Sequence, residues 1–146
     1  MFKLPTVVMA LSGAVFSIIL GIIPFFEYIK FPFTLIGILI SLTGFAVIIW
    51  SMFLYKENGT PINETEKPNV MITTGPFKFT RNPIYLGELL ILIGVAFIVG
   101  NLLSFISPIV YFISINFYYL PEEENVMEQT FGADYLGYKH SARRWL

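Results

Sequence analysis

The sequence predicts an all-α integral membrane protein with about four transmembrane helices and an amphipathic helix at its C-terminus. Hydrophobic residues make up 55% of the 146 residues and charged residues only 13%, and the mean hydropathy is +0.71. A water-soluble domain of this size carries about 25% charged residues to cover its surface. The apolar residues also gather in four long runs. These observations exclude soluble globular, disordered and fibrous classes, and we treat residues 1–146 as a single domain.

The first two apolar runs cover residues 4–26 and 31–55. Each is longer than the ~20 residues that a helix needs to cross a bilayer. Pro24 and Pro32 mark the short turn between them. A signal peptide has a shorter apolar stretch followed by a polar mature domain, so we expect the first run to be a span.

The third and fourth runs, residues 84–100 and 102–120, are separated only by the turn at Gly100 and Asn101, which predicts a tight helical hairpin. Glycines spaced at about two helical turns occur in the second and third runs, at Gly37/Gly44 and Gly87/Gly94. Small residues at this spacing let neighbouring membrane helices approach closely. We interpret them as ordinary packing positions.

Basic residues are distributed unevenly between the two predicted sides of the membrane. With four spans, one side holds the N-terminus, the loop 56–83 and the tail 121–146. That side carries Lys3, Lys56, Lys67, Lys78, Arg81, Lys139, Arg143 and Arg144, whereas the other carries only Lys30. By the positive-inside rule, the N-terminus, the loop and the tail are expected in the cytoplasm.

Composition also limits the kinds of site that the chain can form. The net charge of -1 gives no broad basic face for nucleic acid, and the absence of cysteine excludes thiolate metal sites and cysteine nucleophiles. His140 is the single histidine, so a histidine-rich metal centre is excluded as well. We therefore expect neither nucleic acid nor a metal as a partner.

The polar residues fall in two blocks, 56–85 and 121–144, which the predicted hairpin brings together at the membrane surface. In the first block, Gly75–Pro76 indicates a turn, and Pro83 suits the first turn of a helix. A helix that begins near Asn82 places Tyr85 and Glu88 on one face, with Arg81 just below. A carboxylate inside a span is costly, which makes Glu88 a functional candidate. The alternative is that Glu88 only pairs with Arg81 or reaches up to the interface.

The second block opens with three glutamates, residues 122–124, directly after Pro121. Acidic residues favour a helix N-terminus, so a solvated helix start is the structural alternative to a binding role. Gly132 is expected to break or kink the helix, with Tyr135 and Tyr138 on one face of an amphipathic tail that lies along the membrane. Together the two blocks offer a cation, amides and carboxylates beside aromatic rings. Such a set is compatible with a zwitterionic cofactor that carries a nucleoside and a sulfonium.

Two sets of residues resemble the isoprenylcysteine carboxyl methyltransferase family, which is related to the membrane phospholipid N-methyltransferases. The first set is Glu57-Asn-Gly-Thr-Pro61, Val70-Met-Ile-Thr-Thr-Gly-Pro-Phe77 and Arg81-Asn-Pro-Ile-Tyr-Leu-Gly87, and the second is Glu123-Glu124, Phe131-Gly132 and Tyr135-x-x-Tyr138. The resemblance implies an integral membrane enzyme whose S-adenosylmethionine lies at the cytoplasmic surface, between the last two spans and the C-terminal helix. Carried over position by position, it implies cofactor contacts from Asn69, Val70, Met71, Ile72, Phe77, Asn82, Pro83, Ile84, Tyr85 and Glu123.

The chain departs from the family pattern at three places. Asn82 stands where the family often has histidine, so this position cannot act as an acid or base. Tyr119 stands where the prenylcysteine enzymes have an arginine, and the tail reads Ser141-Ala142-Arg143-Arg144 instead of basic-Val-Pro. The last two departures weigh against prenylcysteine as the substrate.

We therefore expect an S-adenosylmethionine-dependent methyltransferase that acts on a lipid-borne or prenylated acceptor, either at a carboxylate oxygen or at a lipid amine. Alignment of the acceptor with the methyl group would supply most of the rate. Arg81 is the candidate for orienting a carboxylate, and Glu88 or Glu124 is the candidate base for an amine or hydroxyl.

Two other interpretations remain open. A membrane NAD(P)H-dependent sterol-type reductase carries a similar Arg-x-Pro-x-Tyr-x-Gly-Glu motif, which residues 81–88 also match. A non-catalytic membrane protein on the same scaffold is the other. The glutamates at 122–124 and the Phe-Gly…Tyr…Tyr tail favour the methyltransferase, and the identity of the cofactor separates the first two interpretations.

Overall fold

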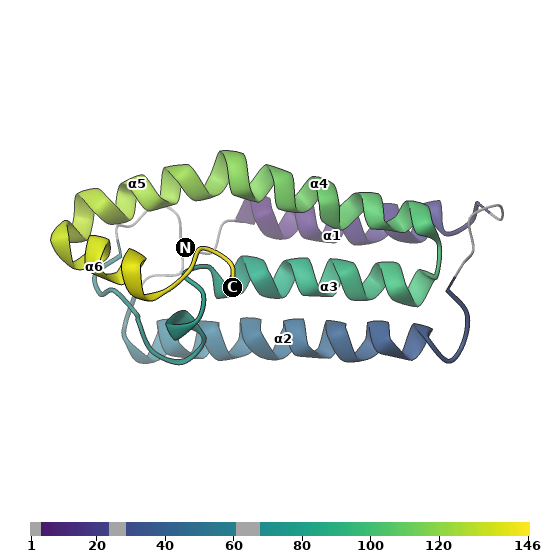
Figure 1. Ribbon diagram of the computed structural model, residues 1–146, viewed down its shortest axis with the longest axis horizontal. Helices are drawn as coiled ribbons and strands as arrows, with labels where there is room; N and C mark the ends of the chain where they lie inside the picture. Colours follow the sequence, from purple (N-terminus) through teal and green to yellow (C-terminus); the bar gives the residue numbers. More distant parts are fainter. Residues whose placement is uncertain (1–3, 24–28, 61–67) are drawn as a thin grey trace.

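Long helices run side by side in an elongated bundle (Figure 1). The computed structural model describes residues 4–23, 29–60 and 68–146, and within these ranges the regular structure is helical and no strand occurs. The predicted all-α class is confirmed for this part of the chain. The α-helices are α1 (Leu4–Leu20), α2 (Thr34–Glu57), α3 (Pro83–Val99), α4 (Ile106–Ser114), α5 (Leu120–Phe131) and α6 (Ala133–Ser141).

Two helical segments are long and apolar enough to cross a membrane: α2 and the segment Leu102–Phe131. Helices α1 and α3 are also apolar but contain 17 residues each, about 25 Å of helix. The count of four spans and their orientation therefore remain predictions. Helix α1 ends at Leu20 rather than Phe26, and residues 24–28 lie outside the described part. Helix α2 continues past the predicted end at residue 55 to Glu57.

Helices α2 and α3 touch through glycines. A methyl group on Gly37 would lie 2.4 Å from the carbonyl oxygen of Gly94, and one on Gly44 would lie 2.5 Å from that of Gly87. No side chain fits at such distances, so the two backbones meet directly. The predicted role of these four glycines in helix packing is confirmed.

Helices α4 and α5 form one continuous helix through the π-helical segment η4 (Ile115–Tyr119). The predicted fourth run ends at residue 120, and a helix start at residues 122–124 is one of the two interpretations of the glutamates. Pro121 lies inside the continuous helix, although proline has no N–H and its ring crowds the preceding turn. The wider π turn directly before Pro121 accommodates both effects. Glu123 and Glu124 therefore continue the helix of the fourth apolar run, and they are buried rather than forming a solvated helix start.

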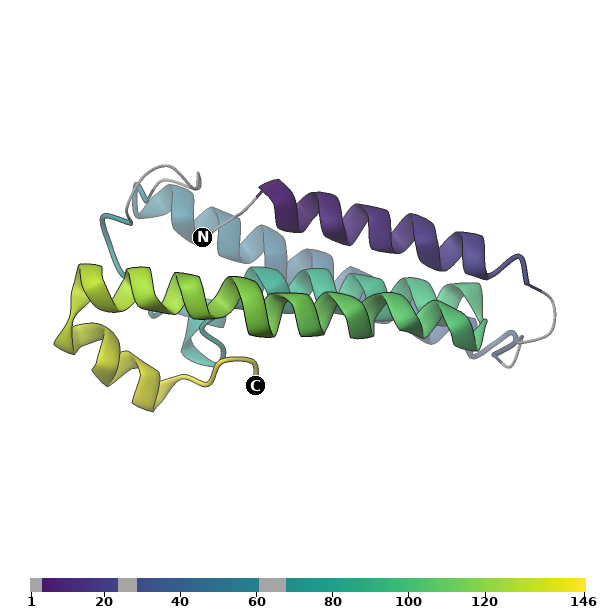
Figure 2. The same cartoon turned by 90° about the horizontal axis from the view of Figure 1, so that it is seen from above.

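The helix breaks at Gly132, as predicted, and the chain reverses there. Helix α5 ends at Phe131, Gly132 has a φ of 53°, and α6 folds back beside the beginning of α3 (Figure 1). Seen from above, α1 lies on one side of α4 and α6 on the other (Figure 2). Tyr135 and Tyr138 are both buried on the inner face of α6. Whether α6 also lies on a membrane surface remains a prediction.

Candidate active site

The two polar blocks meet at one end of the bundle, and Glu124 is at the centre of their contact. Its Oε1 lies 2.8 Å from Nη2 of Arg81, which precedes α3. The Arg144 guanidinium donates to both carboxylate oxygens of Glu124, over 3.0 Å and 2.7 Å. The Glu124 side chain is only 10% exposed. One buried carboxylate thus joins the start of α3 to the segment that follows α6, which confirms that the blocks meet.

Arg81 makes its other contacts with backbone at the end of α6. Its Nη1 donates to the carbonyl oxygens of Lys139 (3.2 Å) and Ala142 (2.8 Å), and its backbone N–H donates to the carbonyl of Arg143 (2.8 Å). A cation that caps the last carbonyls of a helix stabilises that helix end. Arg81 therefore acts as a latch between α3 and α6 in this structure, and its predicted role in orienting a carboxylate remains a prediction.

Tyr85 and Glu123, both predicted to contact the cofactor, bind each other. The Tyr85 hydroxyl donates to Oε1 of Glu123 over 2.6 Å. Tyr85 lies in the first turn of α3, where Pro83 occupies the first position as predicted, and it is 2% exposed. The bond connects α3 to α5.

Glu88 lies one helical turn further along α3 and accepts a hydrogen bond from the Tyr111 hydroxyl on α4. Sequence reasoning offered Arg81 as its alternative partner, but in the structure Arg81 binds Glu124. Tyr111 was not among the predicted residues. The available signal was chemical: a carboxylate inside an apolar helix needs a donor, and Tyr111 is a hydroxyl-bearing side chain within the fourth apolar run.

The predicted cofactor segment before α3 has an exposed and a buried part. Asn69 and Val70 are exposed, and Met71 packs on the α6 cluster of Tyr135, Tyr138 and Ala142. Ile72 and Phe77 are buried.

Phe77 lies in the 3-10 turn η2 (Gly75–Lys78), where the sequence predicted a turn. Its ring meets Tyr55 edge-on with centroids 5.6 Å apart, and its carbonyl accepts a 2.6 Å bond from Tyr138. Tyr55 and Tyr138 therefore hold Phe77 from two sides.

The remaining predicted cofactor residues lie at the start of α3. The Asn82 side-chain amide donates to the carbonyl of Arg144 over 2.8 Å, and the Thr80 hydroxyl donates to the same carbonyl over 3.1 Å. Ile84 is buried at 5% exposure, and Pro83 is buried as well. Asn82 thus holds the C-terminal segment in place through its amide N–H, and this role needs no titratable side chain.

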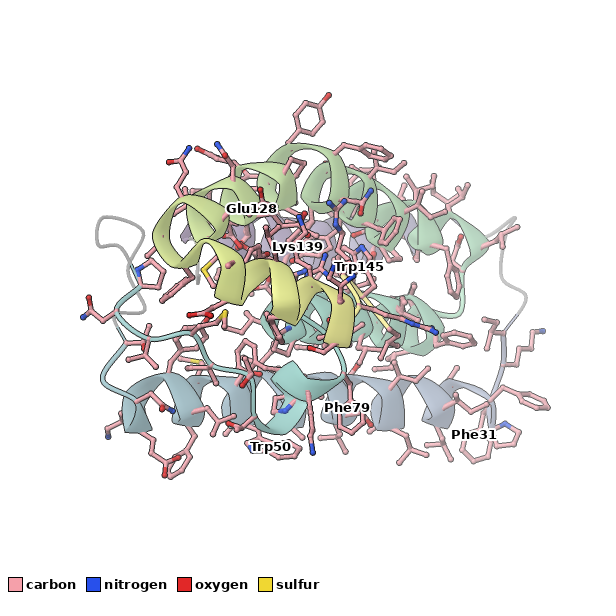
Figure 3. All side chains as sticks on the ribbon, turned by 60° about the vertical axis from the view of Figure 1, so that its left-hand side comes forward. Phe31, Trp50, Phe79, Glu128, Lys139 and Trp145 are labelled. Carbon is pink, nitrogen blue, oxygen red and sulfur yellow. The ribbon has the colours of Figure 1, made fainter. Side chains whose placement is uncertain are left out.

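Further charges and hydroxyls line the junction of α5 and α6. Lys139 forms an ion pair with Glu128 and lies 3.9 Å from Oε2 of Glu124 (Figure 3). Burial, together with the Glu124 charge, raises the pKa of Tyr135 to about 12, although Arg81 acts in the opposite direction. Burial also raises the pKa of Tyr138 to about 12. Both hydroxyls are therefore protonated donors at neutral pH.

Comparison with known proteins gives two matches. The sequence model of the phospholipid methyltransferase family matches residues 33–134. This range includes the carboxylates Glu88, Glu123 and Glu124 and ends before Tyr135. An uncharacterized protein of Haemophilus influenzae is 38% identical to the chain over 63 residues, which is 43% of this chain and the whole of that protein.

Proposed function

Because the chain belongs to the phospholipid methyltransferase family, we propose that it transfers a methyl group from S-adenosylmethionine to the amine of a membrane phospholipid. Family membership and the two long apolar helices identify a methyltransferase associated with membranes. The cofactor, the phospholipid amine and the cytoplasmic position of the site are our proposal.

The side chains at the end of the bundle fit the chemistry of this cofactor. S-adenosylmethionine supplies a methyl group activated on a sulfonium, and it also carries an ammonium, a carboxylate and a ribose diol. Glu123 offers a carboxylate for the diol or the ammonium, held in place by Tyr85. The exposed stretch at Asn69 and Val70 and the aromatic Phe77 offer backbone groups and a ring for the nucleoside.

One observation favours an amine over a carboxylate as the acceptor: Glu124 binds both Arg81 and Arg144. A carboxylate acceptor that bound Arg81 would have to displace Glu124 from a pair in which both side chains are only 10% exposed, and breaking a buried pair is strongly unfavourable. An amine acceptor needs a carboxylate as its partner instead of a cation. Glu88 is a buried carboxylate, and within the described ranges it forms no ion pair with a lysine or arginine.

Glu88 is our candidate for the base. A lipid ammonium must lose a proton before its nitrogen can attack, and a positioned carboxylate can accept that proton. Tyr111 fixes the orientation of Glu88 between α3 and α4. Helix α6 and the Arg81–Glu124–Arg144 cluster cover the polar end of the bundle, which helps to keep water from the reacting groups.

Binding of S-adenosylhomocysteine to detergent-purified protein, measured by calorimetry, tests the cofactor proposal. We expect micromolar binding in the wild type and loss of binding in Tyr85→Ala and Glu123→Ala. Glu122→Ala is the matched control, because Glu122 is an exposed glutamate of the same helix turn. Folded wild-type protein that binds no S-adenosylhomocysteine, with lipid restored, would overturn the proposal, and NADPH would be tested next.

The acceptor is tested with radiolabelled S-adenosylmethionine and vesicles that contain phosphatidylethanolamine. An N-methyl group survives mild alkali, whereas a methyl ester is hydrolysed. We expect label in the lipid fraction that alkali does not release as volatile methanol. Label that alkali releases as methanol would refute the amine assignment and leave the methyltransferase assignment intact.

A further inference from the structure

The residues after α6 form an extended segment that crosses the start of α3. We call residues Ala142–Trp145 the strap. Its backbone is held by Arg81 N–H on the carbonyl of Arg143 and by Thr80 and Asn82 on the carbonyl of Arg144. These bonds fix where the following residue, Trp145, is placed.

Trp145 joins the strap to α4 and to the π-helical segment η4. Its indole N–H donates to Oδ1 of Asn116 over 3.1 Å, and its ring lies 5.0 Å from that of Phe112. Trp145 is half-buried and also packs against the core cluster that contains Tyr85 and Tyr111. It therefore packs on the same core cluster to which the tyrosines that bind Glu123 and Glu88 belong.

The strap and α1 lie on opposite sides of the α3–α4 pair. Figure 1 places α1 behind this pair and the C-terminal segment in front of it, and Figure 2 shows the same relation from above. Met9, Ala10 and Ala14 of α1 pack on the same core cluster from their side. Ile109 and Ile113 are exposed and lie three residues before Phe112 and Asn116, which Trp145 contacts, so helical spacing places them on the same face. Their side chains offer a surface suited to acyl chains.

We propose that the strap closes the side of the site from which a phospholipid acceptor approaches, and that Trp145 determines which amine headgroups reach Glu88. This inference rests on the proposed function. Indole rings favour the headgroup level of a bilayer, where the N–H finds a polar partner and the ring lies among apolar groups. The face of the ring attracts an ammonium, and its bulk limits how many methyl groups that ammonium can carry.

The first measurement locates Trp145 without using activity. The chain contains two tryptophans, and Trp50 lies exposed on α2, at the outer edge of the bundle, whereas Trp145 lies toward its middle (Figure 3). In a Trp50→Phe variant, the remaining tryptophan fluorescence comes from Trp145. We expect phosphatidylcholine brominated near the glycerol to quench this fluorescence more than lipid brominated at the chain ends. Equal quenching by both lipids, or none, would overturn the inference.

The second measurement tests selectivity. In Trp145→Ala, we expect the ratio of kcat/KM for N,N-dimethyl-phosphatidylethanolamine to that for phosphatidylethanolamine to rise about tenfold, because a pocket that loses bulk admits the larger ammonium. Asn116→Leu removes the hydrogen-bond acceptor, keeps similar volume, and is expected to shift the ratio in the same direction. Trp50→Ala removes the same side chain from α2 and should leave the ratio unchanged.

Calorimetry with S-adenosylhomocysteine separates failure of this inference from failure of the proposed function. Trp145→Ala that binds the cofactor product like the wild type but keeps the wild-type ratio would refute the role of Trp145 alone. A wild-type protein that does not bind S-adenosylhomocysteine would refute the proposed function. The fluorescence quenching of Trp145 would then still show whether the strap lies at the headgroup level. If Trp145→Ala does not fold, the ratio in Asn116→Leu decides the selectivity.

Discussion

The Tyr111 hydroxyl donates a hydrogen bond to the Glu88 carboxylate and so joins α4 to α3 inside the bundle. Both side chains are buried, at 2% and 6% exposure. A buried carboxylate requires a hydrogen-bond donor to offset its lost hydration. The pair therefore holds the Glu88 carboxyl in one orientation within an apolar helix, as its proposed role as a proton acceptor would require.

Replacing Glu88 by glutamine should separate catalysis from binding. Glu88→Gln keeps the shape of the side chain but cannot accept a proton, so we expect kcat for amine methylation to fall on the order of 10²–10⁴-fold. The affinity for S-adenosylhomocysteine should stay unchanged. Tyr111→Phe keeps the carboxylate and should reduce kcat less. Label transfer in phosphatidylethanolamine vesicles measures both, and a Glu88→Gln variant with wild-type kcat would remove Glu88 from the mechanism.

Removing the Arg81 guanidinium should release α6. Arg81→Ala breaks one contact of the buried Glu124 and leaves the carbonyls of Lys139 and Ala142 without their donor. We expect a loss of stability on the order of 3 kcal/mol and faster tryptic cleavage around Lys139. Arg81→Lys should recover only part of the loss, because an ammonium cannot reproduce the planar fork.

Lys78→Ala is the matched control for this change, since Lys78 is an exposed cation three residues before Arg81. Thermal unfolding in detergent and the rate of proteolysis are measured together. An Arg81→Ala variant with the same unfolding temperature and the same rate of tryptic cleavage as the wild type would show that the Arg81 contacts do not stabilise α6.

Local signals in the sequence were sufficient for much of this architecture. Pro83 marks the first position of a helix and Gly132 a break between helices, because each residue restricts or permits particular backbone angles. The spacing of Gly37 and Gly44 likewise indicated a close helix contact. The meeting of the two polar blocks followed from the predicted order of the apolar runs.

Pairings across the bundle could not be obtained in this way. Hydropathy locates a helix without fixing which residues of two neighbouring helices face each other. The need of Glu88 for a donor therefore does not single out Tyr111, and nothing in the sequence alone pairs Glu124 with Arg144. The alternative of a solvated helix start at residues 122–124 is wrong for a related reason. A proline indicates a helix end locally, and only the packing of the whole segment shows that a π turn carries the helix through it.

The hydrogen bond from Tyr138 to the Phe77 carbonyl should give α6 a dependence on alkaline pH. Burial raises the pKa of Tyr138 from an ordinary value of 10.0 to about 12. A group whose pKa is raised by folding stabilises the protein fully below its unfolded pKa and loses that contribution as the pH rises through the folded pKa. The contribution should therefore be constant up to about pH 10 and decline toward pH 12.

Tyr138→Phe measures this contribution directly. The difference in unfolding free energy between the wild type and the variant should be constant from neutral pH to about 10 and shrink above it. Tyr118→Phe is the control, because Tyr118 is 75% exposed. A difference that grows with rising pH would contradict the assignment of Tyr138 as the donor.

The contact of α2 with α3 should depend on the absence of a side chain at Gly87. A methyl group there would lie 2.5 Å from Cγ1 of Ile48 and 2.7 Å from the carbonyl oxygen of Gly44, so the helices must separate. We expect Gly87→Ala to cost about 1–3 kcal/mol, because a side chain forced into a close-packed helix contact strains both helices. Since Tyr85 and Glu88 flank this position, binding of S-adenosylhomocysteine should weaken as well.

Gly137→Ala is the matched control: a methyl group at Gly137 meets nothing within 4 Å, and alanine favours the α6 helix. Unfolding temperatures of the two variants measured side by side decide the matter, and a Gly87→Ala protein as stable as Gly137→Ala would mean that the two helices do not meet at their glycines.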